Sequence, residues 1–283
     1  MKFTGFADEA SKNIDQQIEA VKALKWTGIE MRMVLKEGKA VHFDDVDDAT
    51  FETIRGKLDK AGVGVPCYGS QIANWSRKIT GDFNLDVSEL KRIIPRMQKT
   101  GTRLVRIMSY PNDKMGEAEY KKEVFRRMRE LCKMAEDGGI ILAHENCSGY
   151  GGLGYRNTLE MVNELNSPAF KLIFDTGNPI EYGLSTWIFY KAVKQHIVHV
   201  HIKDYLADAA LPKGYRAVYP GEGDGDVLKI TADLKKGGYS GWYSMEPHII
   251  AAVHEGAKNS GEEESVKMFL KYGGMFSELY QRA

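Results

Sequence analysis

The feature that most limits the fold of this chain is an alternation of short apolar segments with amphipathic ones, which repeats eight times in 283 residues. Parallel strands need long crossover connections, usually helices, and eight strand-helix units in about 250 residues is the usual size of a (β/α)8 barrel. We therefore predict a single-domain α/β TIM barrel spanning residues 1–283. The predicted strands are Lys2–Phe6, Gly28–Val34, Val63–Tyr68, Leu104–Met108 and four runs that end at Glu145, Asp175, Lys203 and Glu246. The predicted helices are Ile14–Leu24, Asp48–Ala61, Val87–Lys99, Glu117–Glu136, Thr158–Leu165, Ser185–Lys194, Asp226–Lys236 and Glu263–Tyr280.

An open doubly wound sheet is the alternative architecture for such an alternation. That fold more often carries a glycine fingerprint directly after its first strand, where the backbone approaches a bound pyrophosphate. The segment Phe6–Glu9 has no glycine. The barrel is therefore the better prediction.

Composition limits the partners and the compartment. Lysine plus arginine equals aspartate plus glutamate at 39 each, so no net charge draws the chain to nucleic acid or to an anionic membrane. The cysteines Cys67, Cys132 and Cys147 lie far apart and form no CxxC pair, which argues against a disulfide framework and a thiolate zinc site. Charges at Lys2 and Asp8 interrupt any signal-like core, and no apolar run is long enough to span a bilayer. We expect a cytoplasmic protein.

The segment Ile197–Asp204 is the most informative strand. Its strict alternation places His199, His201 and Lys203 on one face and aliphatic side chains on the other. Burying ionisable side chains is costly unless they have partners, so this face indicates a functional site.

Four ionisable side chains stand at the ends of predicted strands: Glu145, Asp175, His201 and Glu246. A single acid at such a position is more commonly a helix cap or a loop anchor. In a barrel, however, the carboxyl ends of all strands meet at one face, which would bring the four together. Carboxylates with one imidazole suit Mn²⁺ or Mg²⁺, and also allow Zn²⁺ or Co²⁺. The sequence therefore predicts a divalent metal site.

Several short motifs carry a family resemblance in their order and spacing. They are HENCSGYGG around Glu145, FDTGNP around Asp175, HVHIKD around His201, PGEGDGD, GYSGWYSMEPH around Glu246, and the opening FADEASKNIDQQIEAVKALKWTGIEMR. Together they resemble the sugar phosphate isomerase/epimerase family, the xylose isomerase-like TIM barrels. The resemblance implies a metal held by Glu145, Asp175, His201 and Glu246, with the two glutamates also exchanging protons with substrate.

The chemistry that the resemblance implies begins at a carbon next to a carbonyl. A divalent ion on adjacent oxygens of a hydroxy-ketone stabilises the enediolate charge that develops when this carbon loses a proton. One carboxylate removes the proton and another returns it. Return to the same carbon from the opposite face epimerises the sugar, and return to the neighbouring carbon isomerises it. The expected partner is a small-molecule carbohydrate, with no nucleic acid and no membrane, and the family suggests a homo-oligomer.

One position departs from the family pattern. Ketose 3-epimerases of this family commonly have a histidine three residues after the aspartate of the sixth strand, and Asn178 stands there instead. Other reactions therefore stay open. The second hypothesis is a lyase that eliminates water or a glycoside from a keto-sugar or inosose after the same proton removal. The third is a nuclease like the endonuclease IV branch, which needs more histidines and a basic groove than this sequence offers.

The substrate-binding candidates are Asn178, His199, Lys203 and Arg216. Each has a structural alternative. His199 would orient a neighbour or fill the barrel, and Lys203 would pair with Asp175 or Glu246. Arg216 lies in the loop Tyr205–Gly221, which could cover the site and bind a hydroxyl, a phosphate or nothing.

Arg32 and Arg106 point to the same end of the barrel if the strands are assigned correctly. For both we expect buried salt bridges to Glu30 or Glu9 rather than contact with substrate.

Overall fold

The structure is a computed structural model that describes residues 1–249 and 261–283. The chain divides into two compact units. Unit 1 comprises Met1–Pro66, Asp175–Trp187 and Val200–Ala283, and unit 2 comprises Cys67–Phe174 and Ile188–His199. Among the described residues, none of the helices combines the length and the apolar character needed to cross a bilayer.

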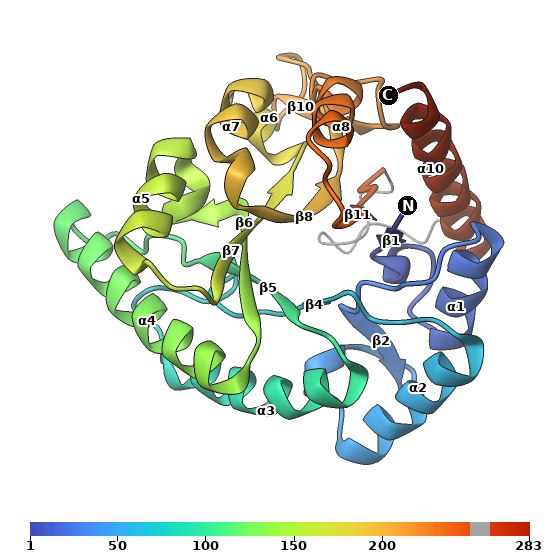
Figure 1. The fold of residues 1–283 in the computed structure, drawn as a ribbon, viewed down its shortest axis with the longest axis horizontal. Coiled ribbons are helices and arrows are strands. Elements are labelled where there is room, and N and C mark those ends of the chain that lie inside the picture. The colour runs from blue at the N-terminus through green and yellow to red at the C-terminus, as the bar shows by residue number, and fades with distance from the viewer. Residues whose placement is uncertain (250–260) are drawn as a thin grey trace. The chain divides into compact units, whose positions relative to one another are not determined.

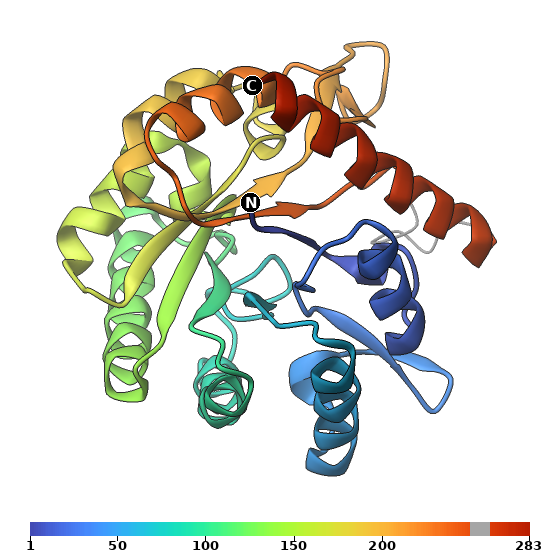
Figure 2. The same cartoon turned by 45° about the vertical axis from the view of Figure 1, so that its right-hand side comes forward.

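Unit 1 contains both ends of the chain. Its strands β1 and β11 pair in parallel, with Gly5 opposite Met245, and the order continues to β8. Both ribbon views show α10 beside α1 (Figures 1 and 2). The strands of the unit are β1 (Phe3–Gly5), β2 (Met33–Lys36), β3 (Lys39–His42), β9 (Asp204–Ala207), β10 (Tyr215–Val218) and β11 (Trp242–Met245). The helices are α1 (Ile14–Ala23), α2 (Asp48–Ala61), α6 (Asn178–Glu181), α8 (Val227–Lys236) and α10 (Glu262–Arg282), with 3-10 turns η1 (Ala7–Glu9) and η2 (Phe43–Asp45).

Unit 2 is built on parallel strands in the order β7-β6-β5-β4. The helices α3, α4 and α5 pack in sequence beside this sheet (Figure 2). The strands are β4 (Cys67–Gly69), β5 (Leu104–Ser109), β6 (Ile141–Gly149) and β7 (Phe170–Asp175). The helices are α3 (Asn84–Thr100), α4 (Glu117–Gly138) and α5 (Tyr155–Leu165), with 3-10 turns η3 (Tyr150–Leu153) and η4 (Lys194–His196). Three elements have residues in both units: β7, whose last residue Asp175 belongs to unit 1, α7 (Thr186–Val193) and β8 (Ile197–Ile202).

Most predicted elements are confirmed with small shifts of their ends. The predicted helix Asp48–Ala61 is α2, and Gly62 ends it in the left-handed region at φ 68° as a C-cap glycine does. The predicted sixth strand ends at Asp175, as β7 does. Helix periodicity and capping are local signals, which is why these bounds could be read from the sequence.

The predicted second strand, Gly28–Val34, is wrong. Gly28 forms only an isolated parallel bridge with Gly64, and the regular strand begins at Met33, where β2 pairs antiparallel with β3 in a hairpin. The physical reason is Pro66. The amide of Ile29 donates to the carbonyl of Gly64 at 3.0 Å, and the next bond of this parallel ladder would need an N–H at position 66, which proline lacks.

Backbone hydrogen bonds within unit 1 join the ends of successive strands in space. They place the segments that carry Glu30, Asp175, His201 and Glu246 next to one another. The bonds, donor first, are Glu30 N to Gly5 O at 3.0 Å, Phe6 N to Met245 O at 3.0 Å, Glu246 N to Ile202 O at 3.0 Å and Thr176 N to His201 O at 3.1 Å.

The glycine-rich motif PGEGDGD wraps around a buried carboxylate. The amides of Gly221, Gly223 and Gly225 donate to the two oxygens of Asp204 at 2.8, 3.0 and 3.0 Å. Successive backbone N–H groups that converge in this way form an anion-binding nest, and here the anion is a side chain of the protein. The motif therefore anchors the loop that follows β10 to the start of β9.

Replacing Gly223 by alanine should destabilise this loop. A Cβ at Gly223 would lie 2.4 Å from Oδ1 of Asp204 and 2.5 Å from the carbonyl of Tyr205, so the backbone must move. We expect Gly223→Ala to lower the free energy of unfolding by about 1–3 kcal/mol, measured by chemical denaturation. The control is Gly56→Ala in α2, where a Cβ meets nothing within 4 Å, and which should add up to about 1 kcal/mol. Equal stability of Gly223→Ala and the wild type would contradict this account.

Candidate active site

Three of the four predicted metal ligands come together in unit 1. Each of Asp175, His201 and Glu246 offers a ligand atom, and these atoms lie within 4.8 Å of one another. Their side chains are fully buried, with relative exposures of 0%, 0% and 2%. We call these residues the ligand set.

Asp175 is the last residue of β7, and its two carboxylate oxygens have different partners. Its Oδ1 accepts hydrogen bonds from the amides of Gly177 at 2.8 Å and Asn178 at 2.7 Å, which orders the turn into α6. Its Oδ2 lies 3.2 Å from the Nζ atom of Lys203. Asp175 is therefore both a turn anchor and a member of the ligand set.

His201 is oriented by a second carboxylate. Its Nε2 lies 3.1 Å from Oε1 of Glu30, and its Nδ1 lies 3.4 Å from Oε2 of Glu246. Because a carboxylate only accepts, the Glu30 contact favours a proton on Nε2 and directs the Nδ1 lone pair to the ligand set. A carboxylate behind a ligating imidazole is the usual outer-shell partner in metal sites. The Phe6 ring packs on the imidazole edge-on at 5.2 Å.

Glu246 follows β11 and also uses its oxygens differently. Its Oε1 faces Nη1 of Arg32 and Nε2 of His248, both at 3.2 Å. Its Oε2 faces Nζ of Lys203 at 3.1 Å and the His201 ring. Burial raises the pKa of Glu246, but the charges of Lys203 and His248 outweigh that effect and hold the pKa well below its ordinary value. Glu246 is therefore ionised at neutral pH.

Lys203 lies between the two carboxylates of the ligand set. Its Nζ contacts Oδ2 of Asp175 and Oε2 of Glu246, and it donates to Oδ1 of Asn178 at 3.1 Å. The side chain is only 3% exposed. The predicted pairing of Lys203 with the two acids is confirmed. Contact of Lys203 and Asn178 with a substrate stays a prediction.

Glu145, the fourth predicted ligand, lies in unit 2 on β6 and is 1% exposed. Its Oε2 is 3.4 Å from Nη1 of Arg106, and Arg106 donates from Nη2 to the carbonyl of Ser70 at 3.1 Å. In the β6–β7 ladder Glu145 stands opposite Ile173, two residues before Asp175 in the same strand. The role of Glu145 as a ligand stays a prediction.

The remaining substrate-binding candidates differ in burial. His199 is 0% exposed in β8, two residues before His201. Arg216 is exposed on β10, in a hairpin with β9 that occupies part of the loop predicted for Tyr205–Gly221. Both roles stay predictions.

Sequence reasoning missed a cluster around Arg32. The salt bridge predicted from Arg32 to Glu9 is confirmed at 3.2 Å, but Arg32 also reaches Asp8 at 3.1 Å and Glu246 at 3.2 Å. The predicted partner Glu30 contacts His201 instead. The only signal in the sequence was the placement of two acids directly after the first strand.

Arg106 is buried in unit 2, where it contacts Glu145. The predicted pairing of Arg106 with Glu30 or Glu9 stays a prediction.

The ligand set fits a divalent cation. Two carboxylates and one imidazole, without thiolate, form the donor type that binds Mn²⁺, Mg²⁺ or Zn²⁺ in proteins. Burial makes the charges interact strongly, and the ammonium of Lys203 supplies only one positive charge between the two acids. Such a site can hold a cation and can present an ionised carboxylate to a bound molecule.

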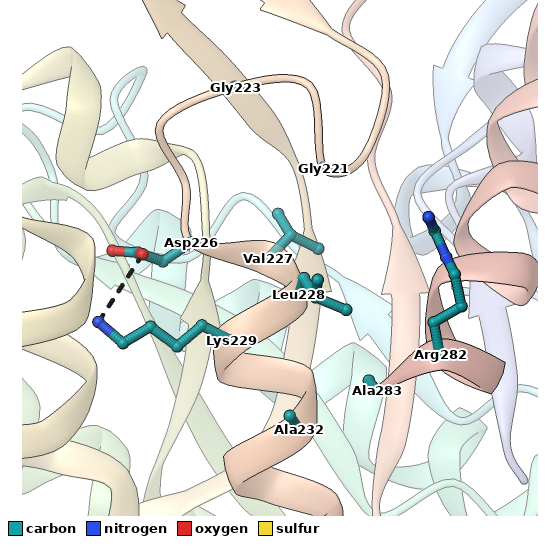
Figure 3. Close-up of a pocket in the computed structure, with 9 residues that line it drawn as sticks. All are labelled: Gly221, Gly223, Asp226, Val227, Leu228, Lys229, Ala232, Arg282 and Ala283. Carbon is teal, nitrogen blue, oxygen red and sulfur yellow. Dashed lines mark ion pairs between the residues drawn. The ribbon is translucent and has the colours of Figure 1, made fainter.

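A separate open pocket of about 420 Å³ lies beside the start of α8 (Figure 3). Its lining includes Asp226 and Lys229, which form an ion pair at 4.0 Å, and Arg282 at the end of α10. The side chains of Lys229 and Asp226 are 52% and 36% exposed, and Arg282 is exposed, whereas the ligand set is buried. The pocket is therefore not the candidate active site.

The chain is similar, over part of its length, to curated proteins named as an epimerase and a dehydratase. A 2-epi-5-epi-valiolone 7-phosphate 2-epimerase of Actinoplanes sp. is 27% identical over 183 residues, which are 64% of this chain and 64% of that protein. An inosose dehydratase of Clostridium beijerinckii is 25% identical over 138 residues, which are 44% of this chain and 46% of that protein. The matches thus span less than two thirds of the length of these relatives.

The fold has a well-matched solved counterpart. The IOLI protein with a bound zinc atom superposes with a TM-score of 0.76 at 19% identity, covering 100% of this chain and 99% of that chain. At this identity the likeness concerns the fold, and it agrees with the predicted (β/α)8 barrel. The sequence pattern of a known family also matches residues 18–271 of this chain. The chain therefore belongs to the xylose isomerase-like TIM barrel family.

Proposed function

We propose that this protein is a divalent-metal-dependent epimerase or isomerase of a keto-sugar or a related cyclic polyol ketone. The observation that carries the proposal is the buried convergence of Asp175, His201 and Glu246 in unit 1. Carboxylates around a cation site are the groups needed to remove and return a proton next to a carbonyl.

Asp175, Nδ1 of His201 and Oε2 of Glu246 would hold the metal, and we propose Glu145 as the fourth ligand. When bound, the ion would stabilise negative charge on the adjacent oxygens of the substrate. Glu246 stays ionised and can accept a proton, while Glu145 would exchange a proton at the other face of the reacting carbon. Glu30 holds the imidazole of His201, and Lys203 can donate a hydrogen bond to a substrate oxygen. Mn²⁺ and Mg²⁺ are the ions we propose first.

The comparisons support this reaction class. The Actinoplanes relative is named as an epimerase of a phosphorylated cyclic substrate. We therefore extend the proposed substrate class to phosphorylated keto-sugars. Arg216, exposed on β10, is our candidate for contact with a phosphate or hydroxyl group.

A lyase is the second candidate function, favoured by the match to inosose dehydratase. It would begin with the same removal of the proton next to the carbonyl. The C–O bond at the following carbon would then break, and the hydroxide would leave as water after taking up a proton. Asn178, which replaces the histidine expected of ketose 3-epimerases, fits this alternative as well.

Product analysis in heavy water should test the proposal and separate the two reactions. We expect the Mn²⁺-loaded protein to incorporate deuterium next to the carbonyl of at least one compound among D-fructose, L-ribulose 5-phosphate and an inosose. A product of unchanged composition that keeps the deuterium means epimerase or isomerase, and loss of water means lyase. Mass spectrometry and proton NMR read both outcomes. No deuterium uptake and no loss of water with any of the three would count against the proposed function.

A further inference from the structure

Arg32 directs its three side-chain nitrogens to three different buried carboxylates. Its Nε atom contacts Oδ2 of Asp8 at 3.1 Å, its Nη2 contacts Oε1 of Glu9 at 3.2 Å, and its Nη1 contacts Oε1 of Glu246 at 3.2 Å. Arg32 is 4% exposed, and its guanidinium carbon lies 4.2 Å from the centre of the Phe6 ring. The planar guanidinium, with donors on all three nitrogens, is suited to such an arrangement, and a lysine ammonium is not.

The neighbouring residues Glu9, Glu246 and His248 also have the spacing of metal ligands, with atoms within 4.8 Å of one another. His248 Nε2 lies 3.5 Å from Oε1 of Glu9 and 3.2 Å from Oε1 of Glu246. These two oxygens are the ones that face the guanidinium of Arg32. A divalent ion bound to them would lie directly beside a buried positive charge, where the repulsion is strong.

The backbone at His248 supports a fixed arrangement. His248 has a φ of 49°, in the left-handed region, which is uncommon for a residue with a side chain. Its amide donates to Oε2 of Glu9 at 2.9 Å, and its Nδ1 lies 3.2 Å from the hydroxyl of Tyr205. Thus both Arg32 and His248 are held by groups other than Glu246.

We infer that Arg32 is the resident cation of the Glu9–Glu246–His248 group and a positioning residue for Glu246, so that this group binds no second metal ion. Arg32 and His248 hold Oε1 of Glu246, and Oε2 alone faces Asp175 and His201. The inference rests on the proposed function for the catalytic role of Glu246. Its metal-counting part needs only the contacts of unit 1.

The first measurement is the number of Mn²⁺ ions bound per chain, read by isothermal titration calorimetry and by equilibrium dialysis with metal analysis. We expect one Mn²⁺ per chain in the wild type, and the same number in Glu9→Gln. Two Mn²⁺ per chain in the wild type, falling to one in Glu9→Gln, would show that the group is a second metal site and would overturn the inference.

The second measurement is the rate of deuterium uptake by the compound that exchanges fastest in the panel above. A displacement of about 1 Å in a catalytic group costs on the order of 100-fold in rate, so we expect Arg32→Met to lower kcat by about that factor. Because all three side-chain nitrogens of Arg32 contact carboxylates of the protein, we expect KM to change by less than about threefold. Arg32→Lys keeps the charge but loses the three-way geometry, and should lower kcat by at least about tenfold.

The matched control is Arg55→Met in α2, which removes a half-buried arginine that bridges Glu52 at 2.8 Å and Asp59 at 2.9 Å. Its kcat and KM should equal those of the wild type. A kcat of Arg32→Lys within about twofold of the wild type would overturn the positioning role.

Folding and function can be separated in this design. Arg32→Met leaves Asp8 and Glu9 buried without their main cation, so circular dichroism is recorded for every variant, and Arg32→Lys decides the outcome if Arg32→Met does not fold. A wild type that exchanges no compound of the panel contradicts the proposed function. In that case the Mn²⁺ count still tests whether Arg32 occupies the second group.

Discussion

Replacing Glu246 or Glu145 by glutamine is expected to abolish proton exchange next to the carbonyl while the protein stays folded. A glutamine amide cannot accept or return the proton, and it is a much weaker metal ligand than a carboxylate. General acid or base catalysis alone contributes about 10²–10⁴-fold, so we expect each variant to lose at least about 10³-fold in the rate of deuterium uptake, measured by NMR. We expect the two variants to fail alike, because each glutamate is proposed both to exchange a proton and to hold the metal.

The control for this experiment is Glu263→Gln in α10, where the side chain is 82% exposed and pairs with Lys267. It should keep the wild-type rate. Removing the charge of Glu246 also leaves Arg32 and Lys203 with fewer partners, so Glu246→Gln should unfold at a lower temperature. Exchange is therefore measured well below that temperature. Persistent exchange in both folded glutamine variants would contradict the two-glutamate mechanism. Only the metal-binding part of the proposal would then stand.

Removing the metal is expected to have an effect of similar size. Dialysis against EDTA should reduce deuterium uptake to below about 1% of the Mn²⁺-loaded rate, because charge stabilisation by the ion supplies several kcal/mol of the barrier reduction. Adding back Mn²⁺ should restore the rate. His201→Ala should show the same loss and also bind Mn²⁺ more weakly, since it removes the only imidazole of the ligand set.

His196→Ala is the matched control for His201→Ala. His196 is only partly buried and lies on η4, just before the start of β8, whereas His201 lies near the end of that strand. Its removal should therefore leave both Mn²⁺ affinity and exchange unchanged. Metal analysis would show whether the EDTA-treated protein is free of metal. If that metal-free protein exchanged deuterium at the wild-type rate, the proposal of a metal-dependent reaction would be wrong. A loss of activity in His196→Ala equal to that in His201→Ala would point to general damage instead.

Much of the fold followed from local patterns. The bounds of α2 and the end of β7 at Asp175 were predicted because apolar periodicity, a C-cap glycine and a terminal acid are written in neighbouring residues. The prediction of the second strand failed because of Pro66. This residue is visible in the sequence, but the segment that it lies beside is not. Pro66 interrupts a ladder only once the Gly28–Gly64 bridge is known, because that register would require the amide of residue 66 to donate to the carbonyl of Ile29.

The candidate site divides in the same way. The sequence by itself determined which residue types stand at the ends of the strands, and so identified Asp175, His201 and Glu246 before any contact was known. Only the tertiary structure decided that Arg32, 214 residues before Glu246, takes up one of its oxygens and that Glu30 holds His201. A strand pattern fixes the face on which a side chain points, because alternation is a property of one strand. The partner of a buried charge depends instead on which segments lie beside that strand and on the competition among all nearby charges, and that is a property of the packed fold.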